Sequence, residues 1–417
     1  MKKILIINQY SSNKGDRAVL YSLLRLLEPY GNCQITVSTS TPAEWENQFE
    51  DRNINIVPWG WDYSVKIKNP VIRFGFFLLR RIKPLTYSLL RSVLIREMPA
   101  FLVRLLVNPS FYRAARNSDL IISTGGHHIT TLLARDAISS QLFDLACCIH
   151  MKKKVVLWSQ SIGPLVFSNP RNETFVRKVL QGVGVIYARE KKSSELAISM
   201  GIDPEKVKIT YETVISLNEL AEYKPATDRK NIVGISVYST VSRSPEELNN
   251  YVTILSNFAD YCVERLNCEV LFIPMELKGS GPDDRWLVNK VISNTKNKSN
   301  CSVVDKDLDA LSHFKLVEEC RYFVGHKTHS VIFALAAGTP LIALAYHPKT
   351  VEFMNQYGLK DYVIPDSELN YEKLVSAFNK MMEDADRLGK KIFSKSRDIA
   401  RTIRSDFNTI IRSSLNG

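Results

Sequence analysis

The segment Val324–Ser330 (VGHKTHS) brings His326, Lys327 and His329 close together in the chain. An aromatic run, RYF, precedes the segment and an apolar run, VIFALAAG, continues from it, so it lies where a strand would turn into a helix. An imidazole can hold and return a proton near neutral pH, and an ammonium group can neutralise an anion. The segment is therefore a candidate for acid–base chemistry on an anionic substrate.

Two polar segments follow predicted strands in the first half of the chain. In NKGD, Asn13, Gly15 and Asp16 either contact a ligand or, in the case of Asp16, stabilise the start of the helix that follows. In STGGHH, the paired Gly125 and Gly126 permit either a sharp turn or close approach of the backbone to a ligand. Both segments are candidate binding loops.

His127 and His128, which follow the paired glycines, are candidate ligands for an anion or a metal ion. No third metal ligand lies at a useful spacing, so we predict no metal site and no cofactor, and leave a requirement for a divalent ion open. Ser161, in QSIGP, lies at the end of the next predicted strand. Arg189, in AREKKS, carries a planar fork suited to a carboxylate or phosphate, or else pairs with a nearby glutamate.

Two further polar segments lie in the second half. Lys349, in YHPK, either binds phosphate or an acceptor molecule, or is a surface lysine at a helix start. Asp283 and Asp284 follow the glycine-containing KGSGP; they either activate a hydroxyl or, as we expect, cap a helix that begins near Arg285.

These residues can lie close together only if the predicted strands end at the same edge of a sheet. The hydrophobic periodicity of the sequence predicts such a sheet. Short apolar runs alternate with amphipathic helical stretches, which is typical of an α/β protein with mostly parallel sheets. In such sheets ligands collect at the carboxyl ends of the strands. The predicted strands are KILIIN, QITVSTS, INIVPWG, DLIISTGG, KVVLWSQS, GVIYARE, NIVGISVY, EVLFIPM, SVVD, RYFVGH, PLIALAY and YVIP.

Length and composition are those of an ordinary folded protein. The 417 residues suit two domains, which we place at 1–222 and 228–417, the second ending in a helical stretch. The MKKILIINQY start has too short an apolar run for a signal peptide and reads as a buried strand. The seven cysteines show no paired CxxC spacing, which favours a reducing cytoplasm over a disulfide framework or a zinc site.

The net charge of +12 is concentrated between residues 66 and 116, where eleven Lys or Arg side chains face the single acid Glu97. The segment is also strongly apolar, but basic residues, Pro84 and Pro99 interrupt every run before membrane-spanning length. It reads as a helical insert packed on the first domain, as a face lying on an anionic membrane, or as a face that docks a partner. Nucleic acid is not favoured, because no recognition motif accompanies the charge.

The order of the motifs carries more information than any one of them. A chain with NKGD near its start, then GG, QSIGP, AREKKS and a histidine-containing strand end leading into IFALAAGTPLIALAYHPK resembles the polysaccharide pyruvyl transferase family. The resemblance covers nearly the whole chain apart from the basic insert. It implies a GT-B-like fold, with two Rossmann-like domains facing a central cleft.

The resemblance also implies a reaction. Pyruvyl transferases of this kind move the pyruvyl group of phosphoenolpyruvate onto hydroxyls of a cell-surface glycan or its lipid-linked precursor, forming a ketal and releasing phosphate. Such an acceptor implies a cytoplasmic protein that acts at the inner face of the membrane when the acceptor is lipid-linked.

Residue by residue, the resemblance assigns roles to four side chains. His329 falls on the family's histidine and is the expected general acid, while Arg189 falls on a substrate-binding arginine. Lys327 stands where the family usually has arginine, which keeps the charge and loses the fork. Lys349 matches a family lysine that follows a tyrosine. Glu212 lies where the family often has an aspartate, and the resemblance leaves its role open.

Two other classes of function remain. A GT-B glycosyltransferase would use a nucleotide sugar and would need an acidic residue for the ribose. A non-catalytic protein would dock on a glycan-assembly complex through residues 66–116.

Overall fold

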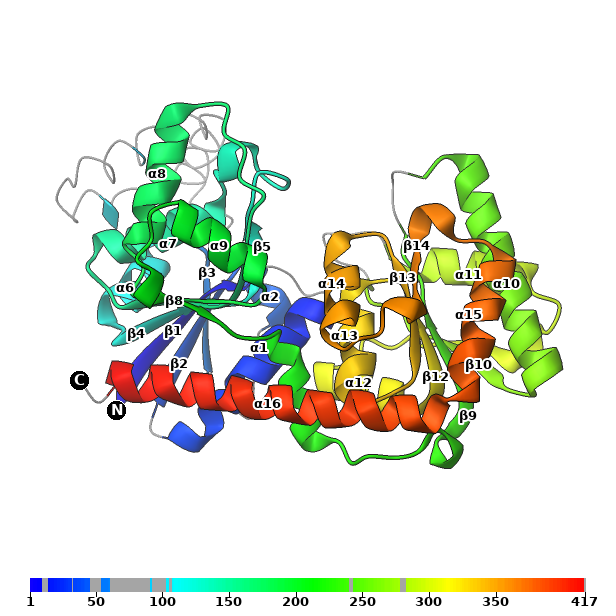
Figure 1. Ribbon diagram of the computed structural model, residues 1–417. Coiled ribbons are helices and arrows are strands. Elements are labelled where there is room, and N and C mark those ends of the chain that lie inside the picture. Colours follow the sequence, from blue (N-terminus) through cyan, green and yellow to red (C-terminus); the bar gives the residue numbers. More distant parts are fainter. Residues whose placement is uncertain are drawn as a thin grey trace. The chain divides into compact units, whose positions relative to one another are not determined.

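The computed structural model describes residues 1–9, 14–31, 33–45, 54–60, 91, 103–104, 107–239, 243–277 and 283–415. The chain divides into two compact units, each built on one parallel sheet (Figure 1). Unit 1 comprises residues 1–12, 23–213 and 405–417, and unit 2 comprises residues 13–22 and 214–404. The arrangement confirms the predicted α/β class.

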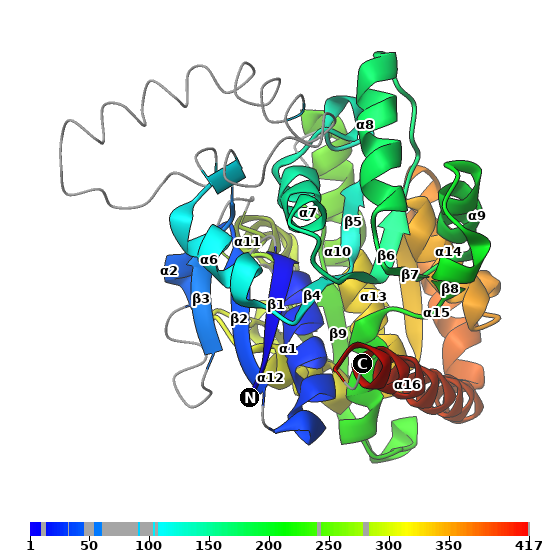
Figure 2. The ribbon, with the colours of Figure 1, turned by 90° about the vertical axis from the view of Figure 1, so that its left-hand side faces the viewer.

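The sheet of unit 1 has the order β3-β2-β1-β4-β6-β7-β8, with β5 paired to β6, and Figure 2 shows the strands in this order. All its described pairings are parallel. The strands are β1 (Lys2–Gln9), β2 (Cys33–Thr39), β3 (Ile54–Pro58), β4 (Leu120–Ser123), β5 (Gly126–Ile129), β6 (Val155–Ile162), β7 (Val185–Ala188) and β8 (Val207–Ile209).

The central strands of unit 1 are buried because helices cover the sheet. Every residue of β4 and β6 is buried, as expected for parallel strands covered on both faces. The helices are α1 (Lys14–Leu27), whose first residues belong to unit 2, and α2 (Pro42–Trp45), α6 (Pro109–Asn117), α7 (Ser140–His150), α8 (Pro170–Gln181) and α9 (Lys191–Ser199). The start of α8 has the residues preferred at helix N-termini: Pro170 is its first residue, and the side chain of Asn169 before it accepts a hydrogen bond from the Arg171 amide.

The sheet of unit 2 has the order β11-β10-β9-β12-β13-β14, again with parallel pairings. Figure 1 shows α12, α13 and α14 on one face of this sheet and α10 and α15 on the other. The strands are β9 (Lys230–Ser236), β10 (Glu269–Phe272), β11 (Cys301–Val303), β12 (Cys320–Gly325), β13 (Leu341–Ala345) and β14 (Val363–Pro365).

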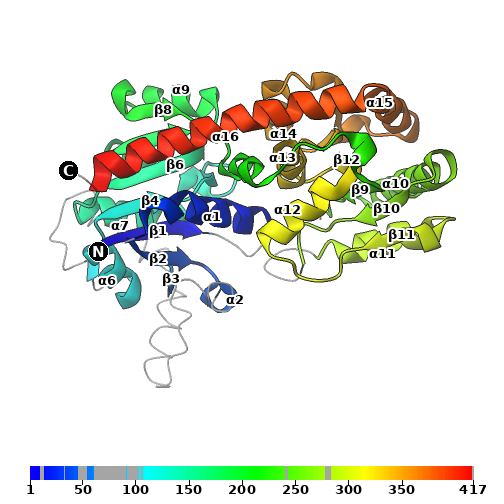
Figure 3. The ribbon, with the colours of Figure 1, turned by 90° about the horizontal axis from the view of Figure 1, so that it is seen from below.

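Capping residues set the ends of two helices in unit 2. Ser244 and Glu247 form a capping box at the start of α10, and Gly338 ends α13 in the left-handed conformation at φ 66°. The helices are α10 (Pro245–Leu266), α11 (Arg285–Asn294), α12 (Ala310–Glu319), α13 (Thr328–Ala337), α14 (Pro348–Gln356) and α15 (Tyr371–Glu383). The continuous helix α16 (Ala385–Leu415), red in Figure 3, begins in unit 2 and ends in unit 1.

Most of the basic segment 66–116 lies outside the described residues, so its predicted membrane or docking role stays a prediction. The part that is described at its end, including α6, contributes buried side chains to the core of unit 1: Val103, Val107, Phe111 and Ala115. Within the described parts of the chain, no helix is both long enough and apolar enough to cross a membrane.

Candidate functional site

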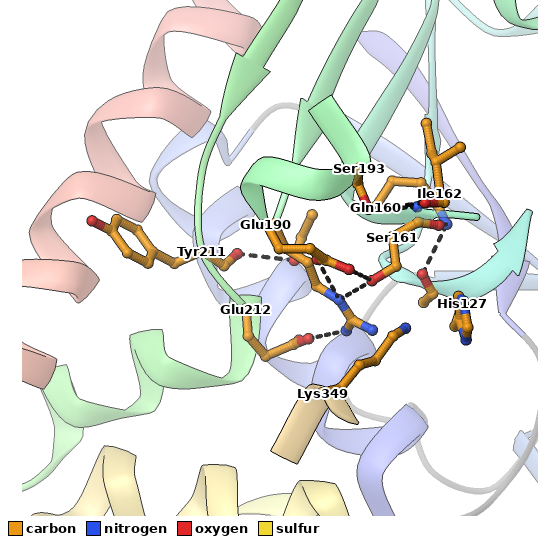
Figure 4. A network of polar contacts seen from close by, with 12 residues as sticks. His127, Gln160, Ser161, Ile162, Glu190, Ser193, Tyr211, Glu212 and Lys349 are labelled. Carbon is orange, nitrogen blue, oxygen red and sulfur yellow. Dashed lines mark hydrogen bonds and ion pairs between the residues drawn. The ribbon is translucent and has the colours of Figure 1, made fainter. Parts of the chain in front are cut away.

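In unit 1 the predicted residue Arg189 lies immediately after β7 and is only 6% exposed. Its Nε donates a hydrogen bond to Ser161 Oγ on β6 at 2.6 Å, and its Nη1 forms an ion pair with Glu212 (Figure 4). Ser161 Oγ in turn donates to Glu190 Oε1 at 2.5 Å. The structure therefore brings Arg189 and Ser161 together and gives Glu212 a definite partner.

The Arg189 cluster contains more negative than positive charge. Glu212 is fully buried, and Glu190 Oε2 lies 3.5 Å from Arg189 Nε. A buried cation needs such partners, because desolvation without pairing costs several kcal/mol (about 3–5 when one partner is removed). Both outcomes weighed for Arg189 are thus compatible with its position. It pairs with local glutamates, and it lies at the carboxyl ends of the strands where ligands bind.

The GG and QSIGP motifs meet beside this cluster. A Cβ on Gly125 would lie 2.7 Å from the Ser159 carbonyl oxygen, so glycine is needed for the close approach of these two backbones. Gln160 Nε2 donates to the Gly126 carbonyl at 2.8 Å, and His127 Nε2 lies 2.5 Å from the Gly163 carbonyl oxygen. Because a carbonyl only accepts, that His127 nitrogen carries the proton. In this structure the His127 side chain links the GG loop to the QSIGP loop.

In unit 2 the predicted residue Lys327 precedes the first residue of α13 and is 9% exposed. Its Nζ lies 2.9 Å from Asp284 Oδ2 and also forms an ion pair with Glu276. Burial lowers the pKa of the Lys327 ammonium, but the carboxylates of Asp284 and Glu276 outweigh it and hold this pKa above its usual value. Lys327 is therefore a charged lysine in contact with two acids.

The expectation that both aspartates cap α11 is correct for one of them. Asp283 Oδ1 accepts a hydrogen bond from the Arg285 amide at 3.0 Å, as a cap does. Asp284 makes no such bond with its side chain. Its fully buried carboxylate binds Lys327, the Ser239 hydroxyl at 2.6 Å and the Glu276 amide at 2.9 Å. The expectation was wrong for Asp284 because a buried cation competes more strongly for it than a helix terminus.

The NKGD loop and the VGHKTHS segment meet in unit 2. A Cβ built on Gly15 would lie 2.2 Å from His329 Nδ1, so only glycine leaves room for the imidazole there. His329 lies in the first turn of α13, and Asp16 lies in the first turn of α1. Asn13 lies outside the described residues. Two motifs separated by more than 300 residues in sequence are thus in direct contact.

The other histidine of the segment, His326, is completely buried and has a different environment. Its Nδ1 lies 2.8 Å from the Tyr251 hydroxyl, and its Nε2 lies 3.1 Å from Asp366, which also pairs with Arg243. Burial lowers the pKa of His326 despite the neighbouring Asp366 carboxylate. His326 anchors the end of β12, and its partners Tyr251 and Asp366 could not be identified from the sequence.

Lys349 is the second residue of α14 and is half-buried. Its amide donates to His347 Nδ1 at 3.2 Å, so His347 caps this helix. The preceding Tyr346 is 37% exposed and stacks on Tyr238 with ring centroids 4.0 Å apart. Among the residues that the structure describes, no group of three or more His, Cys, Asp or Glu side chains is arranged to hold a metal ion.

Several known proteins are similar to this chain along most of its length. The amylovoran biosynthesis protein AmsJ of Erwinia amylovora is 20% identical over 94% of each chain. Among solved structures, a putative UDP-N-acetylglucosamine 2-epimerase from Listeria monocytogenes has a TM-score of 0.60 at 11% identity and covers 99% of this chain and 96% of its own. HepE of Anabaena in complex with UDP has a TM-score of 0.54 at 14% identity and covers 100% of both chains.

At these identities the structural matches establish the GT-B-like fold alone. Family membership rests on the sequence, because residues 13–348 match the sequence model of the polysaccharide pyruvyl transferase family. The match includes Gly15, Arg189, Lys327 and His329, and ends one residue before Lys349. The resemblance found in the order of the motifs is confirmed, and the chain belongs to the polysaccharide pyruvyl transferase family.

Proposed function

We propose that this protein transfers the pyruvyl group of phosphoenolpyruvate to two hydroxyls of a glycan, forming a ketal and releasing phosphate. Family membership supports transfer to a polysaccharide, and the related AmsJ is named for amylovoran biosynthesis. The donor, the ketal product and the residue roles are our proposal.

The observation that carries the proposal is the contact between Gly15 and His329. Gly15 leaves the space that the His329 ring occupies at the start of α13, and His329 Nε2 is buried, so the ring is held in one place. A general acid needs such positioning, because proton transfer requires the donor to lie within hydrogen-bond reach of the atom it protonates.

The chemistry requires one proton at a carbon. Protonation of C3 of phosphoenolpyruvate turns the methylene into a methyl group and makes C2 electrophilic. One glycan hydroxyl then adds to C2, and the second displaces phosphate as the C–O bond to the phosphate breaks. One of the two hydroxyl protons restores the acid, and the other leaves with the phosphate. In this scheme His329 supplies the C3 proton.

The anionic donor must also be held by cations. We assign this role to Arg189, Lys327 and Lys349. Because Arg189 and Lys327 already contact two carboxylates each, they are held rigidly, and the donor's anionic oxygens replace part of their present pairing. Gly125, Gly126, His127 and Ser161 shape the loops around Arg189.

We place the reaction in the cytoplasm, with the acceptor a glycan or its lipid-linked precursor. In the second case residues 66–116 would provide the contact with an anionic membrane, since basic residues interleaved with apolar ones bind such surfaces.

The test is the variant His329→Gln, assayed for phosphate release from phosphoenolpyruvate with a panel of p-nitrophenyl glycosides as acceptors. We expect kcat to fall about 10²- to 10⁴-fold, the usual contribution of a general acid, while the affinity for phosphoenolpyruvate changes little. His150→Gln, at the end of α7, is the matched control and should keep wild-type turnover. Turnover of His329→Gln close to that of the control would refute the assignment.

A further inference from the structure

Two buried cations at the start of α1 share one acidic partner. Lys14 and Arg17 are 1% and 8% exposed, and both pair with Asp307, in the loop between β11 and α12. The Asp307 side chain is 52% exposed, so it closes the cluster on the solvent side. The family resemblance gave no role to any of these three residues.

The pairing leaves part of the arginine unused. Arg17 reaches both Asp307 oxygens through Nη1 alone, at 3.0 Å each, instead of presenting two nitrogens side by side. Its Nε is buried and has no hydrogen-bond partner among the described residues. A buried N–H without a partner is destabilising, and a ligand oxygen would satisfy it.

The local charge also favours an anion. Lys14 contacts Asp307 and donates to the Leu308 carbonyl at 2.5 Å, while the polar partner of Arg17 among the described residues is Asp307. The next acid along the loop, Asp309, caps α12 by accepting from the Ser312 amide at 2.8 Å. Two cations thus face one carboxylate in direct contact, and a second negative charge would complete the pairing of the buried groups.

We propose that Lys14 and Arg17 form a phosphate-binding subsite, and that Asp307 occupies it as a displaceable counter-ion when no ligand is bound. Gly15, between the two cations in sequence, packs against His329 within the same unit, so the first turn of α1 carries both the subsite and the contact with the proposed acid. Resting on the proposed function, we assign the phosphate to phosphoenolpyruvate. A dianionic phosphate suits this pair, because lysine supplies a compact charge and the free edge of arginine supplies directed donors.

Inorganic phosphate binding to the full chain, measured by calorimetry, separates this role from a purely structural ion pair. Arg17→Gln should weaken phosphate binding about 10- to 100-fold, the value of a lost charge-assisted hydrogen bond. Asp307→Asn, which removes the competing charge and keeps the shape, should tighten it. Arg25→Gln on the same helix is the control and should bind as the wild type does. Unchanged or weaker binding in Asp307→Asn, with thermal unfolding showing a folded protein, would overturn the proposal.

The source of the phosphate is tested with two further ligands. If the bound phosphate belongs to the donor, Arg17→Gln weakens the binding of phosphoenolpyruvate. The binding of geranyl diphosphate, a probe for a lipid-linked acceptor, is then unchanged. The reverse pattern overturns the donor assignment. Phosphate binding that depends on Arg17 in a protein without pyruvyl transfer would preserve the subsite and reject the proposed function. Pyruvyl transfer with phosphate binding indifferent to Arg17 would do the opposite.

Discussion

At the level of single residues, the proposed reaction depends most on the space that Gly15 leaves for His329. Gly15→Ala would place a Cβ 2.2 Å from His329 Nδ1, so the imidazole must move. Alanine favours the helix that Gly15 belongs to, so the fold should survive. We expect kcat to fall at least about 100-fold, since displacement of a catalytic group by about 1 Å has that effect.

The control for this prediction is Gly31→Ala, because a Cβ at Gly31 meets no atom within 4 Å. It should retain wild-type turnover in the same phosphate-release assay. If Gly15→Ala is as active as Gly31→Ala, His329 is not held in a reactive position by this contact.

Residue types could be read from the sequence, but their partners could not. Arg189, Ser161 and the GG and QSIGP loops were predicted to lie at strand ends, and the structure brings them together. The pairing of Lys327 with Glu276 spans 51 positions, and that of Lys14 with Asp307 spans 293. Charge alone cannot identify a partner at such separations, because the sequence offers 43 acidic residues as candidates.

At the scale of elements, the buried histidine of α12 makes unit 2 sensitive to acid. His313 lies on the face of α12 that packs toward Phe333 and Met275. Burial, and then the neighbouring Lys14 charge, lower its pKa to about 3. The unfolded chain binds this proton near pH 6.5, before the native state does. The contribution of neutral His313 to the unfolding free energy is therefore fully present above pH 6.5 and is lost as the pH falls toward 3.

The measurable consequence is the loss of unfolding free energy between pH 7 and pH 5.5. In His313→Gln this loss should be smaller than in the wild type by about 1 kcal/mol, measured by urea denaturation at both pH values. Met275→Leu alters the same contact without removing a titrating group, so its pH dependence should match the wild type. An equal loss in His313→Gln and the wild type would show that His313 is not buried in its neutral form.

Element by element, periodicity was a good guide where elements are long or wholly apolar. All twelve predicted strands occur, because short continuous apolar runs such as VVLW and LIALA are typical of strands covered on both faces of a parallel sheet. β5 (GHHI) and β8 (VKI) were missed. Both are short and carry polar residues, and their pairing to β6 and β7 depends on tertiary contacts that leave no periodic signal.

At the scale of the whole molecule, the end of the chain completes the core of unit 1. Residues 405–417 belong to that unit although residues 214–404 form the other. Phe407 is fully buried with its ring 5.2 Å from that of Trp158, and Asp406 accepts a hydrogen bond from Thr210 at 2.8 Å. The start of α1 shows the converse exchange, since residues 13–22 belong to unit 2.

This exchange predicts that a change near the C-terminus destabilises the N-terminal sheet. Phe407→Ala should lower the unfolding free energy by about 3–5 kcal/mol, the cost of a cavity left by a buried phenyl ring. Urea denaturation followed by tryptophan fluorescence would detect the loss, because Trp158 lines the cavity. A decrease below about 1 kcal/mol would mean that α16 contributes little to the core of unit 1.

The identity of the donor can be tested without knowing the acceptor. The GT-B-like fold is shared with proteins whose structures contain UDP, so nucleotide sugars are the natural competing ligands. We would titrate the full chain with phosphoenolpyruvate and, separately, with UDP-glucose by calorimetry. We predict saturable binding of phosphoenolpyruvate with a Kd in the range of about 1 μM to 1 mM, typical of enzyme substrates, and no binding of UDP-glucose. Binding of UDP-glucose without binding of phosphoenolpyruvate would contradict this prediction.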